Sequence, residues 1–331
     1  MILIFIIVGV IVLWIFFYER VLNAMKMIVG AFKFFIKHPR IIFPLFFSWL
    51  VITTIYLYVY FEMDLTLDKS LPVDVALLYA FILIFTLNII VSLSSLILLE
   101  LIEQLETTGK MSILKAIKEA FTKDLVRALP IIVVWSLLSF ILFIIKVIIK
   151  GARKKLGVRE EKSFSGKAAA DVLSSGDGLG FSGYILRTMS KGIRMAVFTM
   201  LPAIAWEDKT TSKAAAKGWK VFTDRFIEMI SGLFVTQLIT IIITIPIGII
   251  YYYNRQVGVE FTEIVWYSVV LFIGFTWSFG MLIEQLFTAE LYLWYMKWEK
   301  AYNEAKRNQE QLPKFNDVEK PSFLDQVSDL I

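Results

Sequence analysis

The sequence predicts an all-α, polytopic membrane helix bundle of about seven transmembrane helices, with amphipathic helices at its cytoplasmic surface. The first observation is composition. The 331-residue chain is 58% hydrophobic and 19% charged, whereas soluble domains average roughly 45–50% and 25%. The second is a mean hydropathy of +0.70. The third is that the apolar residues form uninterrupted blocks of about 20 residues, the length that crosses a bilayer as a helix.

The first block, residues 1–17, predicts an N-terminal transmembrane anchor. A signal peptide normally starts with positive charge and ends in small residues at a cleavage site. This segment has neither feature, and Trp14, Phe16 and Phe17 close it. We therefore expect the block to stay in the mature chain as the first span.

Six further blocks complete the predicted bundle. The weakest is 181–205, because three basic residues interrupt it. A polar tail, 300–331, follows the last block. The six blocks are 41–61, 75–99, 130–149, 181–205, 229–253 and 263–286.

Charge near the block ends predicts orientation, because loops rich in Lys and Arg stay in the cytoplasm. The stretch 18–40 carries five basic residues against one acidic residue, and 62–74 carries four acidic residues against one lysine. These counts place the N-terminus outside and the C-terminus in the cytoplasm. We expect a multi-pass protein of the cell membrane.

The middle of the chain permits two topologies. Residues 100–129 and 206–228 are both expected in the cytoplasm, so 130–205 crosses the membrane either twice or not at all. Two crossings place the basic stretch 150–180 outside, against the charge rule. No crossing leaves two apolar blocks re-entrant or surface-lying. Segment length and an internal repeat favour two crossings.

The internal repeat is the word LIEQL, at 101–105 and 282–286, each time ending the second helix of a hairpin. A polar amphipathic stretch precedes each hairpin. The predicted domains are the 1–17 anchor, a membrane domain over 18–299, and the 300–331 cytoplasmic tail. The membrane domain divides into three units of amphipathic helix plus hairpin, which cover 18–106, 107–205 and 206–299.

Two of the amphipathic stretches, 18–37 and 111–127, place apolar residues at helical spacing opposite Lys and Arg. Such helices lie in the headgroup layer with their cations on anionic lipid, or they pack on the ends of neighbouring helices. We expect membrane lipids as partners. The net charge of +5 fits basic cytoplasmic loops, and we expect no nucleic acid partner.

The segment 200–222, MLPAIAWEDKTTSKAAAKGWKVF, carries a family resemblance. It resembles a pattern in a group of poorly characterised bacterial and archaeal integral membrane proteins. That group is similar to the membrane domain attached to some glycerophosphodiester phosphodiesterases. Gly218 departs from the pattern, because the group usually has serine there. The resemblance implies a multi-pass module without known catalysis, and this chain shows no phosphodiesterase domain. The matching residues are Pro202, Glu207, Ala214, Lys217 and Trp219, and the stretches 31–47 and 108–121 also fit.

Ionisable residues inside apolar blocks are candidate functional residues. Glu103 and Glu284 are equivalent in the LIEQL repeat. We expect both to lie at the interface and to pair with Lys or Arg of the amphipathic helices. The alternative is that the two carboxylates come together to bind a cation or carry a proton.

Two polar stripes follow helical spacing at i, i+4 and i+7. Asn88, Ser92 and Ser95 form a polar helix face, which serves helix packing or lines a pore. The second stripe is basic and lies along the membrane surface, facing lipid, or lines an anion path. It consists of Arg187, Lys191 and Arg194.

The tail ends in an apolar helical face, which predicts docking of a soluble partner or another subunit, or else a frayed end. We also expect a homo-oligomer or a larger membrane complex. The docking residues are Phe323, Leu324, Val327 and Leu330.

Several kinds of site are missing from the sequence. The chain has no cysteine and a single histidine, His38, which excludes disulfides and thiol nucleophiles and argues against zinc. No catalytic signature occurs, so we expect no enzyme, no cofactor and no metal. The leading prediction is a non-enzymatic membrane scaffold or accessory subunit that organises partner proteins or lipids. The alternative is a transporter or channel for a small solute or ion that uses the Glu103/Glu284 region.

Overall fold

The computed structural model of the chain describes residues 36–66, 72–154 and 180–319, together with six single positions between 18 and 30. The described residues are helical or lie in short turns, and no strand occurs among them. Five of the helices are long and apolar enough to cross a membrane. The predicted all-α class is therefore confirmed for the described residues, and five helices have the length and apolar composition of membrane spans. The predicted anchor 1–17 and the docking face at Phe323, Leu324, Val327 and Leu330 lie outside the described residues.

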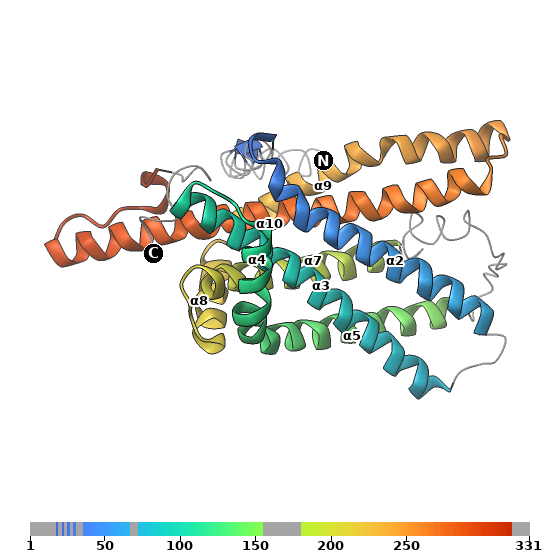
Figure 1. Cartoon of the computed structure of the whole chain (residues 1–331), viewed down its shortest axis with the longest axis horizontal. Coiled ribbons are helices and arrows are strands. Elements are labelled where there is room, and N and C mark those ends of the chain that lie inside the picture. Colours follow the sequence, from blue (N-terminus) through green and yellow to red (C-terminus); the bar gives the residue numbers. More distant parts are fainter. Residues whose placement is uncertain are drawn as a thin grey trace, which may run out of the picture.

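The helices follow one another through short turns, in long antiparallel runs (Figure 1). In chain order they are η1 (Pro39–Ile41), α2 (Ile42–Thr66), α3 (Val73–Thr108), α4 (Ile113–Glu119), η2 (Ala120–Asp124), α5 (Leu125–Lys154), α7 (Gly180–Ala205), α8 (Thr211–Asp224), α9 (Phe226–Tyr252), η3 (Tyr253–Val257), α10 (Glu263–Asn308) and η4 (Phe315–Asp317).

The turn between α3 and α4 is built from local capping. Gly109 adopts φ +65° after the last residue of α3 and donates its N–H to the Leu105 carbonyl at 2.9 Å. Ser112 then caps α4 by accepting the N–H of Lys115 at 3.4 Å. Arg40 Nη1 donates to the Met111 carbonyl at 3.0 Å and ties the start of α2 to this turn.

The predicted surface helix at 111–127 is not a separate element. The chain continues from α4 through η2, one π-helical turn, directly into α5. The candidate span accordingly covers Ile113–Ile149. π-turns are a common cause of helix bends, and α4 is turned away from the axis of α5 in Figure 1. The amphipathic stretch and the apolar block are thus one bent helix.

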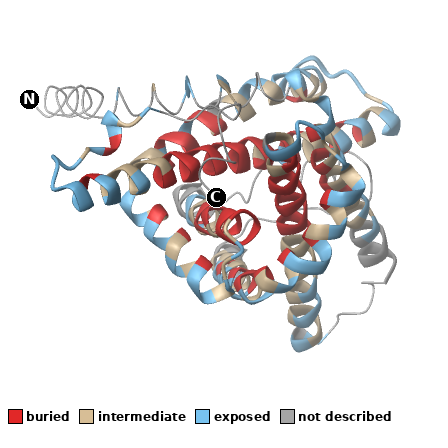
Figure 2. Ribbon diagram, turned by 60° about the vertical axis from the view of Figure 1, so that its left-hand side comes forward, coloured by how far each residue is buried: buried red, intermediate tan, exposed pale blue. Residues whose placement is uncertain are grey.

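The bundle is centred on α3, the most buried of the five candidate spans. Helices α2, α5 and α7 pack against α3, and α10 packs against α2, α7 and α9. Figure 2 shows buried residues in continuous stretches on the inner helices. Helix α9 is the least buried span, and its exposed residues include Ile241, Ile245 and Ile249, an apolar face suited to lipid.

Helix α10 is the longest element. Its 46 residues span roughly 70 Å, more than twice the hydrocarbon core of a bilayer. The helix continues past residue 300, where the polar tail was expected to begin, and ends at Asn308. The chain then folds back along it, because Trp298 Nε1 donates to the Pro313 carbonyl and Trp294 Nε1 to the Val318 carbonyl, each at 3.0 Å.

The seven-helix count stays a prediction. Helix α7 has 26 residues, which is long enough to span a bilayer, but it is not among the five apolar candidates. Three basic residues lie along it, at 187, 191 and 194. The repeat also stays a prediction, although a short helix does precede a hairpin at α4–α5–α7 and again at α8–α9–α10.

Candidate functional site

Most of the buried ionisable side chains of the described residues lie at the end of the bundle that carries α4 and α8 (Figure 1). We call this the charged end. It contains two groups of charges. The first is the α7–α8–α10 junction, defined by Arg194, Glu207, Lys217, Glu284 and Glu299. The second is an acidic cavity between α3, α4 and the loop that follows α7.

In the junction, Arg194 of α7 binds Glu284 of α10. Nε donates to Glu284 Oε2 at 2.9 Å and Nη2 donates to the same oxygen at 2.5 Å. The two side chains are only 12% and 5% exposed. The pair therefore joins one residue of the predicted basic stripe to one residue of the predicted carboxylate pair. This replaces the lipid-facing or anion-facing role expected for Arg194, because its charge is committed to Glu284.

The second part of the junction centres on Glu207. Its Oε2 accepts from Lys217 Nζ at 2.9 Å, and the Tyr292 hydroxyl and the Lys209 ammonium also donate to this carboxylate. Lys217 also lies 3.0 Å from Glu299 Oε2. Three segments are thus joined: the loop after α7, α8 and α10.

These contacts shift the ionisation of both partners. Burial alone raises the pKa of Glu207, but the hydrogen bonds donated by Lys209, Tyr292 and Lys217 outweigh it and hold the pKa below its ordinary value. Burial lowers the pKa of Lys217, but the carboxylates of Glu207 and Glu299 outweigh it and hold the pKa above its ordinary value. Both groups are therefore charged at neutral pH, and each stabilises the other.

Gly218 permits the close packing of α7 and α8. A Cβ at this position would lie 2.6 Å from Met200 Cα, a separation that forces the helices apart. The Thr199 hydroxyl donates to the Gly218 carbonyl at 3.1 Å across the same contact. This contact gives a physical reason for glycine at position 218.

In the loop after α7, the neighbouring residues Glu207 and Asp208 point into different groups of charges. Trp206 Nε1 donates to the Leu99 carbonyl at 3.1 Å, and the Lys209 N–H donates to the Ala203 carbonyl at 3.1 Å. Asp208 adopts φ +50° between them, a conformation that aspartate tolerates better than most residues. Glu207 then belongs to the junction, while Asp208 lines the acidic cavity.

Asp208 forms the ion pairs at the edge of the cavity. Its Oδ1 lies 2.5 Å from Lys123 Nζ and accepts from Arg127 Nη1 at 2.8 Å. The hydrogen bond from Lys123, followed by that from Arg127, holds the pKa of Asp208 below its ordinary value. The Thr211 hydroxyl donates to the Arg127 carbonyl at 2.7 Å, so α8 begins against the same residue.

The acidic cavity has a volume of about 170 Å³. The Glu100 carboxyl lies in its wall within hydrogen-bonding reach of the carboxyls of Glu119 and Asp124. Lys115 Nζ lies 3.8 Å from Glu119 Oε1. The lining residues are Glu100, Glu103, Gln104, Thr107, Lys115, Glu119, Lys123, Ala205 and Asp208.

The structure places Glu103 and Glu284 in different clusters. Glu103 lines the acidic cavity, whereas Glu284 binds Arg194. The glutamine that follows in each LIEQL copy is separated in the same way. Gln104 lines the acidic cavity, whereas Gln285 lines a different, smaller pocket. The repeated words therefore sit in two distinct polar environments, and Glu103 and Glu284 belong to no common site.

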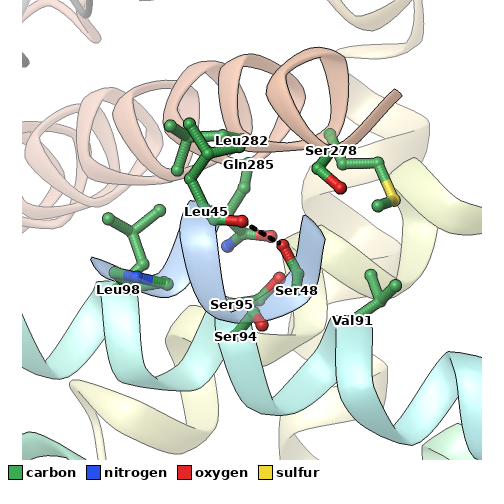
Figure 3. Close-up of a pocket in the computed structure, with 11 residues that line it drawn as sticks. Leu45, Ser48, Val91, Ser94, Ser95, Leu98, Ser278, Leu282 and Gln285 are labelled. Atoms are coloured by element: carbon green, nitrogen blue, oxygen red, sulfur yellow. Dashed lines mark hydrogen bonds between the residues drawn. The ribbon is translucent and has the colours of Figure 1, made fainter. Parts of the chain in front are cut away.

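The polar face of α3 serves contacts between helices. Asn88 Nδ2 donates to the Ser136 hydroxyl of α5 at 3.1 Å. Ser92 is fully buried, and Ser95 lines a pocket of about 20 Å³ between α2, α3 and α10. Figure 3 shows Ser95 beside Ser94, Ser48, Ser278 and Gln285 in this pocket. The volume is about that of one water molecule, which fits helix packing better than a pore.

The rest of the basic stripe is only partly described. Lys191 lies half-buried on α7. The side chain of Arg187 lies outside the described residues.

The sequence indicated several of the residues at the charged end, but it did not indicate which of them contact each other. Glu207 and Lys217 were singled out only through the family resemblance, and nothing local indicated that they bind each other. Tyr292 carried no signal at all, since a tyrosine in an apolar helix is ordinary core. Asp124 was overlooked, although a carboxylate inside an amphipathic stretch that continues into a span is a signal.

The comparisons with known proteins add no family. No family model matches the chain, and a search of curated proteins gives no significant match.

Proposed function

We propose that this chain is a non-enzymatic membrane scaffold or accessory subunit that organises lipids or partner proteins at its charged end. The observation that carries the proposal is the outer surface of α4 and α8. Leu114 of α4 is 81% exposed and Trp219 of α8 is 55% exposed. Lys118 and Lys220 are exposed on the same two helices.

The inner sides of these helices are buried. Ala116 faces inward on α4, as do Ala214 and Val221 on α8, and each is fully buried. The outer sides are therefore held in place by packing. Tryptophan and lysine together favour the headgroup layer of an anionic membrane, where the indole ring and the ammonium both find partners. Exposed apolar side chains close to lysines in the sequence also suit a protein interface.

The test compares complexes in mildly solubilised native membranes. The patch variant combines Leu114→Ser with Trp219→Ser, both at exposed positions where folding is tolerant. The matched control combines Val257→Ser with Val259→Ser, exposed residues in and beside η3 at the opposite end. We expect the patch variant to lose anionic lipid per chain or to run as smaller complexes on native gels. Unchanged lipid content and complex size would contradict the scaffold proposal.

The finer topology is part of the same proposal. We infer seven spans in the cell membrane, with α7 crossing, the N-terminus outside and the C-terminus in the cytoplasm. The length of α7 and its packing against α3, α5 and α10 support a crossing. The chain has no cysteine, so single cysteines report sidedness directly. An impermeant maleimide added outside should label Gln256→Cys and Ser165→Cys but not Lys213→Cys. Failure to label Ser165→Cys alone would favour no crossing between 130 and 205.

The three-unit arrangement and the family resemblance are also proposals. The succession of short helix and hairpin at α4–α5–α7 and at α8–α9–α10 supports the units. The ion pair of Glu207 with Lys217 gives the resembling segment a structural role. We further propose a homo-oligomer or larger complex, with the tail as a docking helix. Deleting residues 320–331 should then reduce complex size on the same gels.

A transporter or channel is the second proposed function, and it is supported by the position of Glu103 in the lining of the acidic cavity. Glu284 is bound to Arg194, so the proposed path uses Glu103 without it. Cation flux in proteoliposomes distinguishes the two functions. Flux that Glu103→Gln abolishes would establish transport and overturn the scaffold proposal.

A further inference from the structure

The small pocket between α2, α3 and α10 lies inside the bundle (Figure 3). All three helices are candidate membrane spans, and the pocket has a volume of about 20 Å³. Four serine side chains and one glutamine side chain line it together with apolar residues, and none of these described lining residues is ionisable. The pocket therefore suits a small, polar and uncharged ligand.

Gln285 is the lining residue that points to a ligand. Its side chain reaches from α10 toward Ser48 of α2 in Figure 3, and the residue is only 1% exposed. Neither its Nε2 donor nor its Oε1 acceptor has a hydrogen-bond partner in the described part of the chain. Buried polar atoms are normally paired with protein or with ordered water. The amide therefore calls for a ligand that both accepts and donates hydrogen bonds.

Two serine hydroxyls of the lining are also unpaired. The Oγ atoms of Ser94 and Ser278 are buried, and neither has a hydrogen-bond partner among the described residues. A hydroxyl inside a helix can donate to a carbonyl of the preceding turn, as Thr276 donates to the Phe272 carbonyl at 2.9 Å. Ser94 and Ser278 do not form this bond. The unpaired groups around the pocket thus come from two helices, α3 and α10.

Water meets these requirements. It both donates and accepts, whereas a metal cation cannot accept the Gln285 N–H and a simple anion cannot donate to the Gln285 Oε1. The volume of about 20 Å³ exceeds the roughly 10–15 Å³ that a single water needs, and it is too small for a lipid headgroup. A single enclosed water touches each lining atom over a small area, so a polar atom closed to bulk solvent can still face it. Cavities that stay dry are apolar, and this one is not.

We propose that this pocket binds one ordered water molecule, held by the Gln285 amide and by serine hydroxyls of α3 and α10. The water joins α10 to α3 through hydrogen bonds inside the membrane-spanning part of the bundle, where lipid supplies none. The site goes beyond the scaffold proposal and does not depend on it, because hydration of the pocket is measured without partner, lipid patch or flux.

The experiment is X-ray radiolytic footprinting of the full chain in nanodiscs. Irradiation generates hydroxyl radicals from water, so a buried side chain is oxidised rapidly only where a bound water lies beside it. Met281 lines the pocket and is 6% exposed, whereas Met296, on the same helix and outside the pocket, is 7% exposed. We expect Met281 to be oxidised several-fold faster than Met296, as measured by mass spectrometry. A rate for Met281 no higher than that for Met296 would overturn the proposal.

Variants connect the water to the unpaired groups of α10. Gln285→Leu combined with Ser278→Ala should lower the Met281 rate to that of Met296, because an apolar cavity stays dry. The matched control Gln104→Leu makes the same glutamine substitution in the other LIEQL word, outside this pocket, and should leave the Met281 rate unchanged. An unchanged Met281 rate in the double variant, or an equal fall in the control, would overturn the assignment of the water to Gln285 and Ser278. The comparison of the two methionines in the unaltered chain tests the site even where a variant does not fold.

Discussion

In the α7–α8–α10 junction, the buried carboxylates of Glu207 and Glu284 each contact a cationic side chain, whereas Glu100 and Glu103 in the acidic cavity contact none that the structure describes. The two regions occupy the same end of the bundle. The comparison separates two uses of buried charge. In the junction, cationic partners join one helix to another, whereas in the acidic cavity the carboxyls of Glu100, Glu119 and Asp124 lie within hydrogen-bonding reach of one another.

The largest expected effect breaks the junction at Arg194. Replacing it in Arg194→Met leaves Glu284 buried without a partner, which should lower the free energy of unfolding by about 3–5 kcal/mol. The double variant Arg194→Met/Glu284→Met should recover most of this loss, because no charge remains buried. Denaturant unfolding in detergent, followed by tryptophan fluorescence, measures both. Equal losses in the single and double variants would show that the pair is not the source of the effect.

The second effect concerns Lys217. Lys217→Met removes the cation shared by Glu207 and Glu299 and should cost about 2–3 kcal/mol of unfolding free energy. Lys220→Met is the matched control on the same helix, since Lys220 is 61% exposed and lies 4.0 Å from Glu299. We expect the control to change stability by less than about 0.5 kcal/mol. A similar loss in both variants would refute the assignment.

The third effect tests packing within the junction. Gly218→Ser introduces a Cβ into the backbone of Met200 and should destabilise the chain by about 1–3 kcal/mol. Gly192→Ala on α7 meets nothing within 4 Å and should be neutral or stabilising by up to about 1 kcal/mol. Thermal unfolding midpoints compare the two. Tolerance of serine at 218 would remove the packing explanation for this glycine.

The fourth effect is a gain in stability in the acidic cavity, opposite in sign to the losses expected in the junction. In divalent-free buffer, Glu103→Gln relieves like-charge repulsion in the acidic cavity and should stabilise the chain, by up to about 1 kcal/mol. Glu207→Gln in the junction should destabilise it, because it breaks a matched ion pair. Unfolding titrations of the two variants in parallel give the signs. Loss of stability in both would mean that the regions do not differ.

The smallest effect is the pH dependence at Asp208. Its folded-state pKa lies below the ordinary value of 3.8, so its contribution is present above pH 3.8 and is lost as the pH falls through the folded-state value. The side chain is 60% exposed, so solvent screens its ion pairs and the loss should be shallow. Unfolding midpoints between pH 5 and 3 should decline less steeply in Asp208→Asn than in the unaltered chain. Identical slopes would exclude a contribution from Asp208.

Much of the secondary structure was predictable, because block length and hydrophobicity act locally. The block 229–253 corresponds to α9 at Phe226–Tyr252, and 181–205 to α7 at Gly180–Ala205. The predicted helix ends were wrong where a helix continues into polar sequence. Helix α3 runs on to Thr108 and α10 to Asn308, beyond the apolar residues that predicted them. A helix continues into polar sequence where capping and packing sustain it, and hydrophobicity does not report on either.

The sequence identified several residues of the candidate sites, but not which residues contact each other. Glu103 and Glu284 were predicted as a pair because both lie in the word LIEQL. A shared word places each residue on the face of its own helix, but it does not determine which other helix that face contacts. Arg194 and Glu284 are 90 positions apart, and Glu207 and Tyr292 are 85 apart. Such contacts depend on how helices pack, which no local pattern encodes.

By itself, therefore, the sequence determined the helical class of the described residues, the presence of helices long and apolar enough to cross a membrane, and the position of most of these helices. These follow from the length of apolar segments and from the high cost of placing unpaired charge in lipid. Only the tertiary structure decided that Glu284 meets Arg194, that Gly218 brings α7 onto α8, and that Glu100 and Glu103 share a cavity. Helix packing brings together residues from distant parts of the chain, and each carboxylate becomes paired or unpaired according to the neighbour that packing supplies.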